Sequence, residues 1–518
     1  MKFTGDNLPR TEYQLELIRS RDDRQILASQ WIRQHGLAES RFGKFTPRFG
    51  YNGEVLRNDG APSDRLGGQS FRYNEFMSGV SLDSVSRMSF SALYTVRRDD
   101  SLSGGTLQHA ASSITQTYGW RVTGGNALSS ALDVTLQRKS FAETFRHAVA
   151  DDVNGILVRS QTQFNPLDRG VESDFFYEAA TGRSAKMERV FQRVPRGTGN
   201  YTYVGDVNNN RSVDEQDFQL TRFDGDYIAI TVPTDQFIPI VDLKASTRIR
   251  LAGTRLFSHP NSWFENTLAI LSSESYARVE EKSDETDKNQ IYLLHLSRFL
   301  NDRTTLAGSN IFSQDLFFLE NNPAFSIRLR YSQRRGLTQF ALNTERGYVR
   351  EQSIRLRWQL VKEFANQTDI LDRTDILGTD QLSTRAHDIR ATSFVTDWSY
   401  RPEQRVELAF KFSFGQGTNF DSTTADLNDQ SVRLLYSFND RGQVRGELTR
   451  EEVMLSQVGP IIPFELTAGK VGGKSWLWRL GMDYRVTQFI QGSMNYDGRS
   501  EGGGQPVHTA RAEVRAFF

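Results

Sequence analysis

The run DVNNNRSVDEQD, which begins at Asp206, is the sharpest local motif in the chain and is rich in oxygen-bearing side chains. Oxygen donors occupy positions 1, 3, 5, 7, 9 and 12 of this run, in the order Asp206, Asn208, Asn210, Ser212, Asp214 and Asp217. Several oxygens wrapped around one centre are the ligands that a hard divalent cation requires, and Ca²⁺ takes about six to eight of them. The spacing therefore predicts a Ca²⁺ site in which Asp217 is the bidentate ligand.

These offsets resemble an EF-hand or dockerin-type calcium loop. Val213 stands at position 8, where such loops often carry a hydrophobic anchor. Arg211 stands where glycine usually makes the sharp turn, and only three of the ligands are carboxylates, so we expect modest affinity. An Asx-rich turn that binds no ion is the alternative that the sequence leaves open.

No other motif predicts a catalytic or phosphate site. The run AGKVGGKS, from Ala468 to Ser475, satisfies a relaxed phosphate-loop pattern, but such a loop needs a following helix, and here WLWRLGMDYRV alternates like a strand. We interpret this run as a flexible glycine-rich loop. The seven histidines are scattered singly, HExxH and GxSxG are absent, and there is no cysteine, so we predict that the protein is not an enzyme.

The overall composition excludes two further classes of protein. Basic and acidic residues balance at 63 each, which leaves no basic field for nucleic acid. Mean hydropathy is −0.53, and no apolar run approaches the ~18 residues of a membrane-spanning helix. The opening residues, MKFTGDNLPRTEYQ, lack the apolar stretch of an export signal, so we interpret the sequence as a mature form or a fragment of a longer precursor.

The elements around these loops follow a period of two residues. From Ser475 to Val486 every second side chain is large and apolar, beginning with Trp476, while arginine, aspartate, serine or glycine fill most of the alternate positions. The segments 325–331, 354–360 and 406–414 alternate in the same way. Such segments match tilted transmembrane strands of about 9 to 11 residues, in which one face meets lipid and the other a polar lumen.

Short turns alternate with long polar loops along the C-terminal half, and aromatic residues gather at strand ends. These features predict an all-β fold, a large antiparallel transmembrane β-barrel of about 16–20 strands counted from Phe45, with an inserted non-barrel domain. A large soluble β-sandwich or β-solenoid is the alternative, since the same apolar residues would then form its core.

Two stretches do not follow this alternation. Thr11 to Gly36 carries apolar residues at loosely helical spacing, which predicts a short helix in the N-terminal segment 1–40. Turn residues dominate about 165–240, which predicts a compact inserted domain that carries the calcium-like loop. Barrel strands are then expected over 41–164 and 241–518.

The final strand, VHTARAEVRAFF, alternates small or apolar residues with polar ones and ends on Phe518. It resembles the terminal signal of bacterial outer-membrane proteins, which the barrel-assembly machinery recognises. The insert resembles, over about seventy residues, segments of large surface proteins of Bacteroidota-type bacteria. These resemblances imply a location in the bacterial outer membrane, with membrane lipid and the assembly machinery as partners, and deletion of Phe518 is expected to slow assembly.

Together these features predict an outer-membrane β-barrel that acts as a pore, a transport or secretion component, or a surface anchor. Arginines on the polar face should line its interior: Arg355, Arg357, Arg479, Arg485, Arg511 and Arg515. Two alternatives stay open. One is a non-transporting surface protein or structural subunit of a larger outer-membrane assembly, with partner proteins in a surface or secretion complex, and the other is a soluble all-β binding protein.

Overall fold

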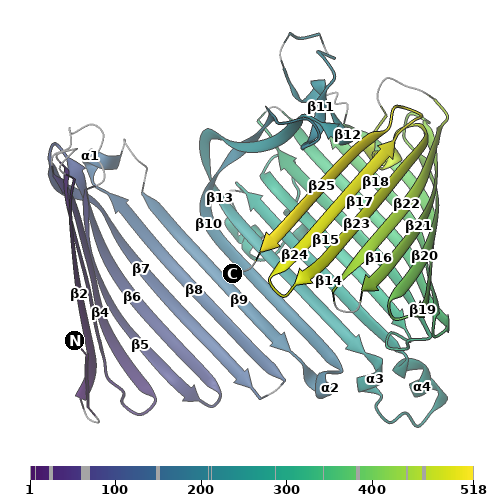
Figure 1. Cartoon of the computed structure of the whole chain (residues 1–518). Coiled ribbons are helices and arrows are strands. Elements are labelled where there is room, and N and C mark those ends of the chain that lie inside the picture. Colours follow the sequence, from purple (N-terminus) through teal and green to yellow (C-terminus); the bar gives the residue numbers. More distant parts are fainter. Residues whose placement is uncertain are drawn as a thin grey trace. The chain divides into compact units, whose positions relative to one another are not determined.

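The computed structural model describes residues 2–5, 8–22, 27–59, 70–125, 127–146, 152–207, 209–211, 213–285, 287–341, 343–380, 385–438, 441–457 and 462–516. Over these residues the chain is almost entirely strand, and 25 strands are hydrogen-bonded into one sheet (Figure 1). The ladders between neighbouring strands are antiparallel. The predicted all-β antiparallel fold is confirmed. No helix in the described part of the chain is both long and apolar enough to cross a membrane.

The chain divides into two compact units. Unit 1 comprises 1–183, 239–247 and 285–295, and unit 2 comprises 184–238, 248–284 and 296–518. The strands that begin in unit 1 are β1 (Lys2–Gly5), β2 (Leu8–Asp22), β3 (Leu27–Glu39), β4 (Phe45–Asp59), β5 (Phe71–Val85), β6 (Met88–Ser103), β7 (Thr106–Gly124), β8 (Leu128–Phe141), β9 (Val153–Phe164) and β10 (Val171–Arg193). Its helical turns are α1 (Glu143–Arg146), α2 (Pro166–Arg169) and α5 (Lys288–Tyr292).

Unit 2 holds the C-terminal half of the sheet. The strands that begin there are β11 (Gly199–Tyr203), β12 (Phe218–Gly225), β13 (Tyr227–Ala252), β14 (Leu271–Ser283), β15 (Thr305–Phe318), β16 (Phe325–Gln339), β17 (Thr344–Val361), β18 (Phe364–Thr379), β19 (His387–Glu403), β20 (Val406–Thr418), β21 (Thr424–Phe438), β22 (Gly442–Leu455), β23 (Gly473–Thr487), β24 (Ile490–Ser500) and β25 (Val507–Ala516). Its helical segments are η2 (Glu215–Asp217), α3 (Gly253–Leu256), α4 (Trp263–Ala269), η3 (Leu296–Arg298) and α6 (Phe464–Thr467).

The predicted N-terminal helix is wrong, because residues 8–22 and 27–39 are the strands β2 and β3. They pair antiparallel from Arg10↔Glu39 to Asp22↔Leu27. Tyr13, Leu15 and Leu17 already show period two on β2, and the neighbouring Ile18 blurred it into a helical spacing. The predicted count of 16–20 starts at Phe45 and leaves out the insert. On that basis β4–β10 and β13–β25 make 20 strands, and β1, β2, β3, β11 and β12 bring the described sheet to 25.

The predicted insert also begins later than expected. Ser173–Ala180 of β10 pair with β9, so this part of the chain continues the sheet of unit 1. The segment that departs from the sheet pattern is 184–238, which belongs to unit 2 and is called the insert below. Gly182 and Ser184 interrupt the alternation in sequence, which hid the strand that runs through them.

Connections in unit 2 alternate between two rims of its sheet. Turns such as 362–363, 404–405 and 488–489 join strands at one rim, which we call the short-turn rim. The connections 456–472 and 501–506 lie at the opposite rim, the long-loop rim. Because strands are antiparallel, successive connections must alternate between the two rims. The predicted contrast of loop lengths is present from β17 to β25, whereas the connection 253–270, which carries α3 and α4, is a long one on the short-turn rim.

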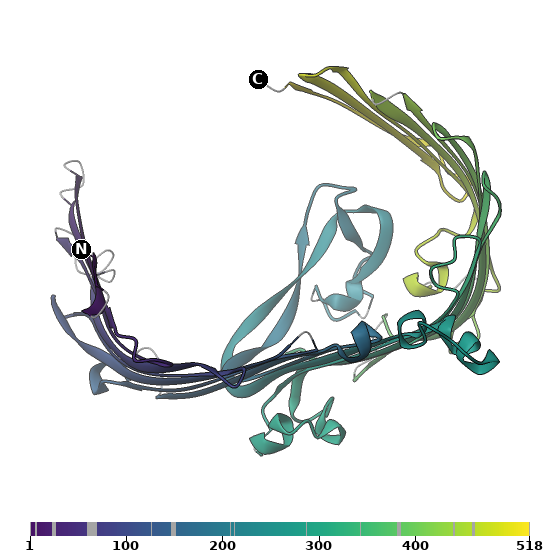
Figure 2. The same ribbon diagram turned by 90° about the horizontal axis from the view of Figure 1, so that it is seen from below.

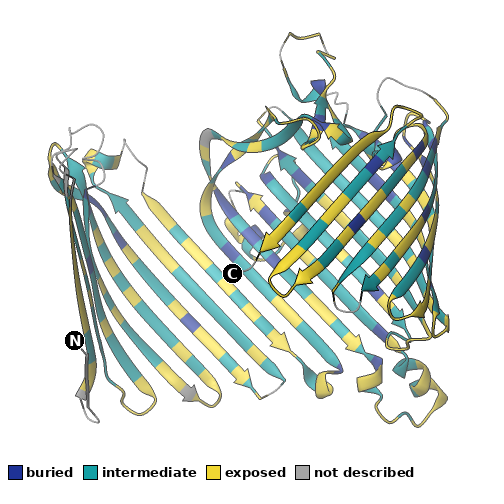
Figure 3. Cartoon of the chain, viewed as in Figure 1, coloured by how far each residue is buried: buried dark blue, intermediate teal, exposed yellow. Residues whose placement is uncertain are grey.

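One face of the unit 2 sheet is apolar and open to the surroundings. A continuous row crosses β15 to β20, each residue directly opposite the next: Leu316, Leu329, Ile354, Ile370, Phe394 and Phe414. Each is 40 to 49 % exposed. The buried apolar cluster of unit 2, by contrast, is small and centred on Ile389, Ala425 and Leu466. Exposed rows of this extent indicate contact with lipid or protein rather than water, and Figure 3 shows how few strand residues are buried.

The other face carries charge. The row Arg433, Glu447, Arg479 and Asp497 crosses β21 to β24 with the sign alternating at each strand. Within unit 2 the sheet is curved, and the insert lies on its concave side (Figure 2). The insert pairs with Glu451 and Arg499, which share the face of this charged row, so the concave face is the polar one.

Candidate functional site

The concave face of unit 2 is covered with cross-strand ion pairs. Guanidinium groups lie 2.5 to 3.0 Å from carboxylates of the next strand in Arg355–Asp369, Arg445–Asp483 and Arg479–Asp497, and of the next strand but one in Arg433–Asp397. Strand register places all six predicted interior arginines on this polar face. Because each pair cancels its own charge, the wall is polar but close to neutral.

A loop from the long-loop rim folds back onto this wall. Leu466 of α6 packs against Ile389 and Ala425, and a Cβ on Gly417 would lie only 3.0 Å from the Leu466 side chain. Small residues on the inner face therefore make room for the loop. The Lys470 ammonium completes the attachment, 2.5 Å from an Asp429 oxygen and 4.0 Å from Glu451.

The insert has a small aromatic core of its own. The rings of Phe191 and Phe218 stack with centroids 4.0 Å apart, and Tyr201, Tyr203 and Tyr227 meet this pair edge-on. Phe218 and Tyr201 are buried. β11 pairs with β12, so strand pairing and aromatic packing together give the insert a defined shape.

A four-residue charge cluster joins the insert to the long-loop rim. Arg189 of the insert donates to both oxygens of Glu345 at 3.0 and 3.1 Å, and it also bonds Glu215. Arg385 reaches the same two carboxylates at 2.6 and 2.7 Å. All four side chains are only 12 to 23 % exposed. We call this set the rim cluster; it has two positive and two negative charges and is electrically neutral.

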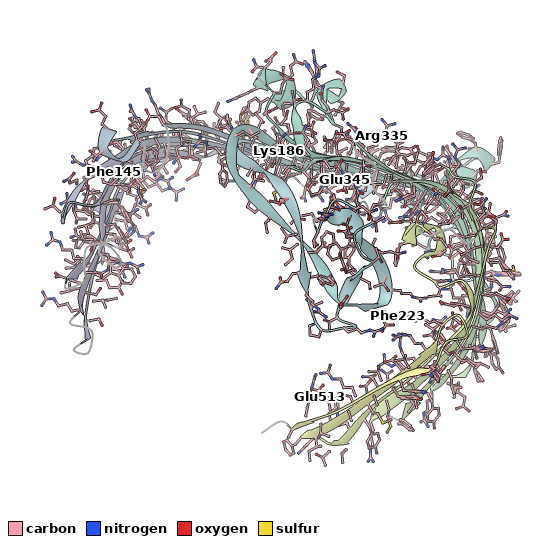
Figure 4. The ribbon with its side chains drawn as sticks, turned by 90° about the horizontal axis from the view of Figure 1, so that it is seen from above. Phe145, Lys186, Phe223, Arg335, Glu345 and Glu513 are labelled. Carbon is pink, nitrogen blue, oxygen red and sulfur yellow. The ribbon has the colours of Figure 1, made fainter. Side chains whose placement is uncertain are left out.

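A second contact joins β12 to the wall farther along the insert. Arg222 donates to both oxygens of Glu451 at 3.1 and 2.8 Å, and Arg499 donates to Asp224 at 2.8 Å. The guanidinium of Arg499 also lies 4.6 Å from the ring centroid of Phe223. Figure 4 shows Phe223 on the insert and Glu345 where the insert meets the sheet, both on the concave side. We call Arg222, Asp224, Glu451 and Arg499 the wall contact.

Sequence reasoning identified neither contact. In both contacts, the residues that bond the insert to the sheet are 156 to 275 positions apart in the sequence, as in Arg189–Glu345 and Asp224–Arg499. No local spacing signals such a pair. The one available clue was that the insert interrupts a run of amphipathic strands and is itself rich in charge.

The predicted calcium loop forms a tightly hydrogen-bonded turn. Asp206 accepts backbone N–H bonds from Asn210 and Arg211 at 3.1 and 2.9 Å. The buried Asp217 accepts from Val207 and Asp214 at 3.0 and 3.1 Å. Arg211, at the usual glycine position, has a left-handed φ of 61°.

The Asp214 carboxylate accepts hydrogen bonds from the backbone of Gln216 and the side chain of Asn210. Two predicted ligands, Asn208 and Ser212, lie outside the described residues. Among the residues that the structure describes, no three Asp, Glu, His or Cys side chains gather closely enough to hold a metal ion. Ca²⁺ binding at this loop stays a prediction.

The Asp217→Ala variant should loosen this loop whether or not Ca²⁺ is present. It removes two acceptors from backbone N–H groups in a buried position, at a cost of about 1 to 3 kcal/mol. Limited proteolysis should show faster cleavage between about 197 and 227, with Glu188→Ala, elsewhere in the insert, as the control. If calcium also binds, chelation alone should accelerate cleavage of the wild-type chain, and an identical pattern with and without chelator would leave only the Asx-turn explanation.

A buried acid lies near the long-loop rim, two residues before the end of β14. Glu281 is 1 % exposed and accepts hydrogen bonds from the Thr305 hydroxyl and, at 3.3 Å, the Leu300 backbone. Burial raises the pKa of Glu281 to about 7, although both hydrogen bonds oppose the rise. The folded state therefore binds this proton more tightly than the unfolded chain does.

This acid should make the connection 296–304 sensitive to pH. The raised pKa stabilises the folded state by up to ~3 kcal/mol. This stabilisation is complete below the ordinary pKa of about 4.5 and is lost as the pH rises through about 7. Once rates are divided by the intrinsic, base-catalysed exchange rate at each pH, the amides in 296–304 should be less protected at pH 8.5 than at pH 5.5. Glu281→Gln should abolish this difference in protection, whereas Glu280→Gln on the neighbouring position should preserve it; a difference in protection that survives Glu281→Gln would exclude this carboxyl as its source.

No family model matches the chain, and no curated protein matches it. Solved structures that align with the chain include the copper transporter OprC, at 10 % identity and a TM-score of 0.40, with 99 % of this chain and 81 % of that one covered. The FrpB iron transporter from Neisseria meningitidis aligns at 8 % identity, TM-score 0.39 and the same coverage. The outer membrane transporter YddB from Escherichia coli aligns at 10 % identity and a TM-score of 0.37, and the alignment covers 99 % of this chain and 80 % of that one. Alignments with identities and TM-scores this low establish no family relationship for the chain.

Proposed function

We propose that the chain is a bacterial outer-membrane β-barrel protein that forms a conduit for polar solutes. The observation that supports this most is the two-faced sheet of unit 2. An exposed apolar row runs along one face, and a row of alternating charge runs along the other.

The apolar face favours lipid as its neighbour. Its strands are 10 to 18 residues long in β14 to β25, enough for the about 9 to 11 residues of a tilted membrane strand. An all-strand protein can satisfy its backbone hydrogen bonds between strands, which is the condition for crossing a bilayer without helices. A soluble sandwich would instead have to bury this row.

The polar face favours passage of water and small polar solutes. Paired arginines and carboxylates hold water, yet their charges cancel, so we expect weak selectivity for ion sign. The proposal includes no catalytic role, and it leaves the transported solute open. Ca²⁺ binding by the loop at 206–217, assembly-machinery recognition of the C-terminal strand and partner proteins of a surface or secretion complex are further parts of this proposal.

Planar-bilayer recording of the purified full chain tests the conduit. Discrete current steps that disappear on heat denaturation would support it. Protein that co-floats with liposomes but conducts no current in any variant described below would favour the second candidate, a surface anchor or subunit. The covered concave wall is the observation behind that candidate. Protein that remains in solution without detergent would contradict both.

A further inference from the structure

We propose that the insert is a hinged cover over the polar wall, fixed at the rim cluster and released at the wall contact. This inference rests on the proposed conduit, because a cover over the polar face would govern passage along it. It follows from a difference between the two attachments of the same insert.

The attachment at the rim is strong and partly made by the backbone. The Ala341 N–H donates to the Met187 carbonyl at 2.8 Å, which fixes the insert's first strand to the end of β16. Nearby, the four side chains of the rim cluster are largely shielded from water, and Arg189 lies 4.5 Å from the ring centroid of Phe340. Shielded bidentate pairs of this kind hold geometry well.

The attachment at the wall is made by side chains beside an open cavity. A cavity of about 480 Å³ lies between β12 and strands β22 to β25, and its lining includes Arg222, Phe223, Thr449 and Arg479. The wall contact spans this space by its two ion pairs. In each pair the insert's member is the more exposed one: Asp224 is 47 % exposed against 19 % for Arg499, and Arg222 is 31 % exposed against 8 % for Glu451, so solvent and salt reach the insert's side of the contact.

Ion pairs with one partly exposed member are weakened by salt more than pairs shielded on both sides, as in the rim cluster, where every side chain is at most 23 % exposed. The wall contact should therefore open first, and the insert should swing about its rim end. Glu451 is central to this release, because it binds Arg222 of the insert and also lies 4.0 Å from Lys470 of the inward-folded loop. When Arg222 leaves, Lys470 remains to neutralise Glu451.

Cysteine accessibility tests the release directly, since the native chain contains no cysteine. Thr449→Cys places a thiol on the wall beside Arg222 and Phe223, and Ser493→Cys places a control thiol on the same face of β24. A sulfonate-bearing thiol reagent is added to the full chain in liposomes. In the Arg222→Gln/Arg499→Gln background, Cys at 449 should react about tenfold faster, and Cys at 493 at an unchanged rate.

A matched background controls for net charge. Arg193→Gln/Arg196→Gln also removes two positive charges, from the end of β10 and the turn that follows it, outside the wall contact, and should leave labelling at 449 unchanged. The Thr449→Cys chain with its wall contact intact provides a second measurement should the double variant fail to assemble. Its labelling should quicken from low salt to ~1 M salt, where the screening length falls to about 3 Å.

The outcomes separate the cover from the conduit. Equal labelling of residue 449 in both backgrounds, with no response to salt, would overturn the cover. Faster labelling accompanied by larger bilayer currents supports both cover and conduit. Faster labelling with no current in any variant supports the cover and overturns the conduit.

Discussion

Ile370→Arg should prevent stable insertion of the protein into membranes. Ile370 lies centrally in β18 within the exposed apolar row, opposite Ile354 and Phe394 on the neighbouring strands. An arginine near the bilayer midplane costs about 2 to 4 kcal/mol in a β-barrel. The expected result is loss of co-flotation with liposomes and loss of the folded form on unheated gels.

The matched control is Leu371→Arg, one residue along the same strand. Register turns Leu371 to the polar face, opposite Ser353 and Ser393, where a guanidinium can stay hydrated. It should assemble almost normally. Leu480→Arg and Arg479→Leu form a second pair of the same design on β23, with the first expected to be the harmful change. Equal tolerance on both faces would show that the apolar row does not face lipid.

Glu345→Ala should release the insert from the rim. This change removes a carboxylate that both Arg189 and Arg385 bind, in positions that are largely shielded from water. Removing one carboxylate from a shielded charge cluster leaves the arginine charges there less well compensated. We therefore expect the free energy of unfolding of the insert to fall by about 2 to 4 kcal/mol. The measurement is the denaturant midpoint for protease cleavage within residues 184–238.

Asp483→Ala serves as the comparison, because it also breaks an arginine–carboxylate pair. In that pair Arg445 and Asp483 are 56 % and 33 % exposed, so its loss should cost less than about 1 kcal/mol. Should Glu345→Ala prove no more damaging than Asp483→Ala, the rim cluster would not be the attachment point, and the hinge would have to lie elsewhere.

The amino-acid sequence by itself determined the two-faced strands of this protein. Period two is a local property: each residue's face is fixed by its neighbours in the same strand. The alternation from Trp476 to Val486 therefore predicted both the strand and its polar side, and β23 has that arrangement. The same reasoning failed at residues 11–36, where the loosely helical spacing of apolar residues such as Leu15, Ile18 and Trp31 suggested a helix that cross-strand pairing excludes.

Only the tertiary structure decided which face the insert covers and what holds it there. Arg189, Glu345 and Arg385 come from the insert, the start of β17 and the loop before β19, and folding alone brings them within hydrogen-bond distance. Arg222 and Glu451 are likewise 229 residues apart. Charge pairing of this kind depends on the curvature and register of many strands at once, and these are collective properties that no local pattern encodes. The cover is therefore a property of the folded sheet, whereas the strands that form the wall are already readable in the alternation of their residues.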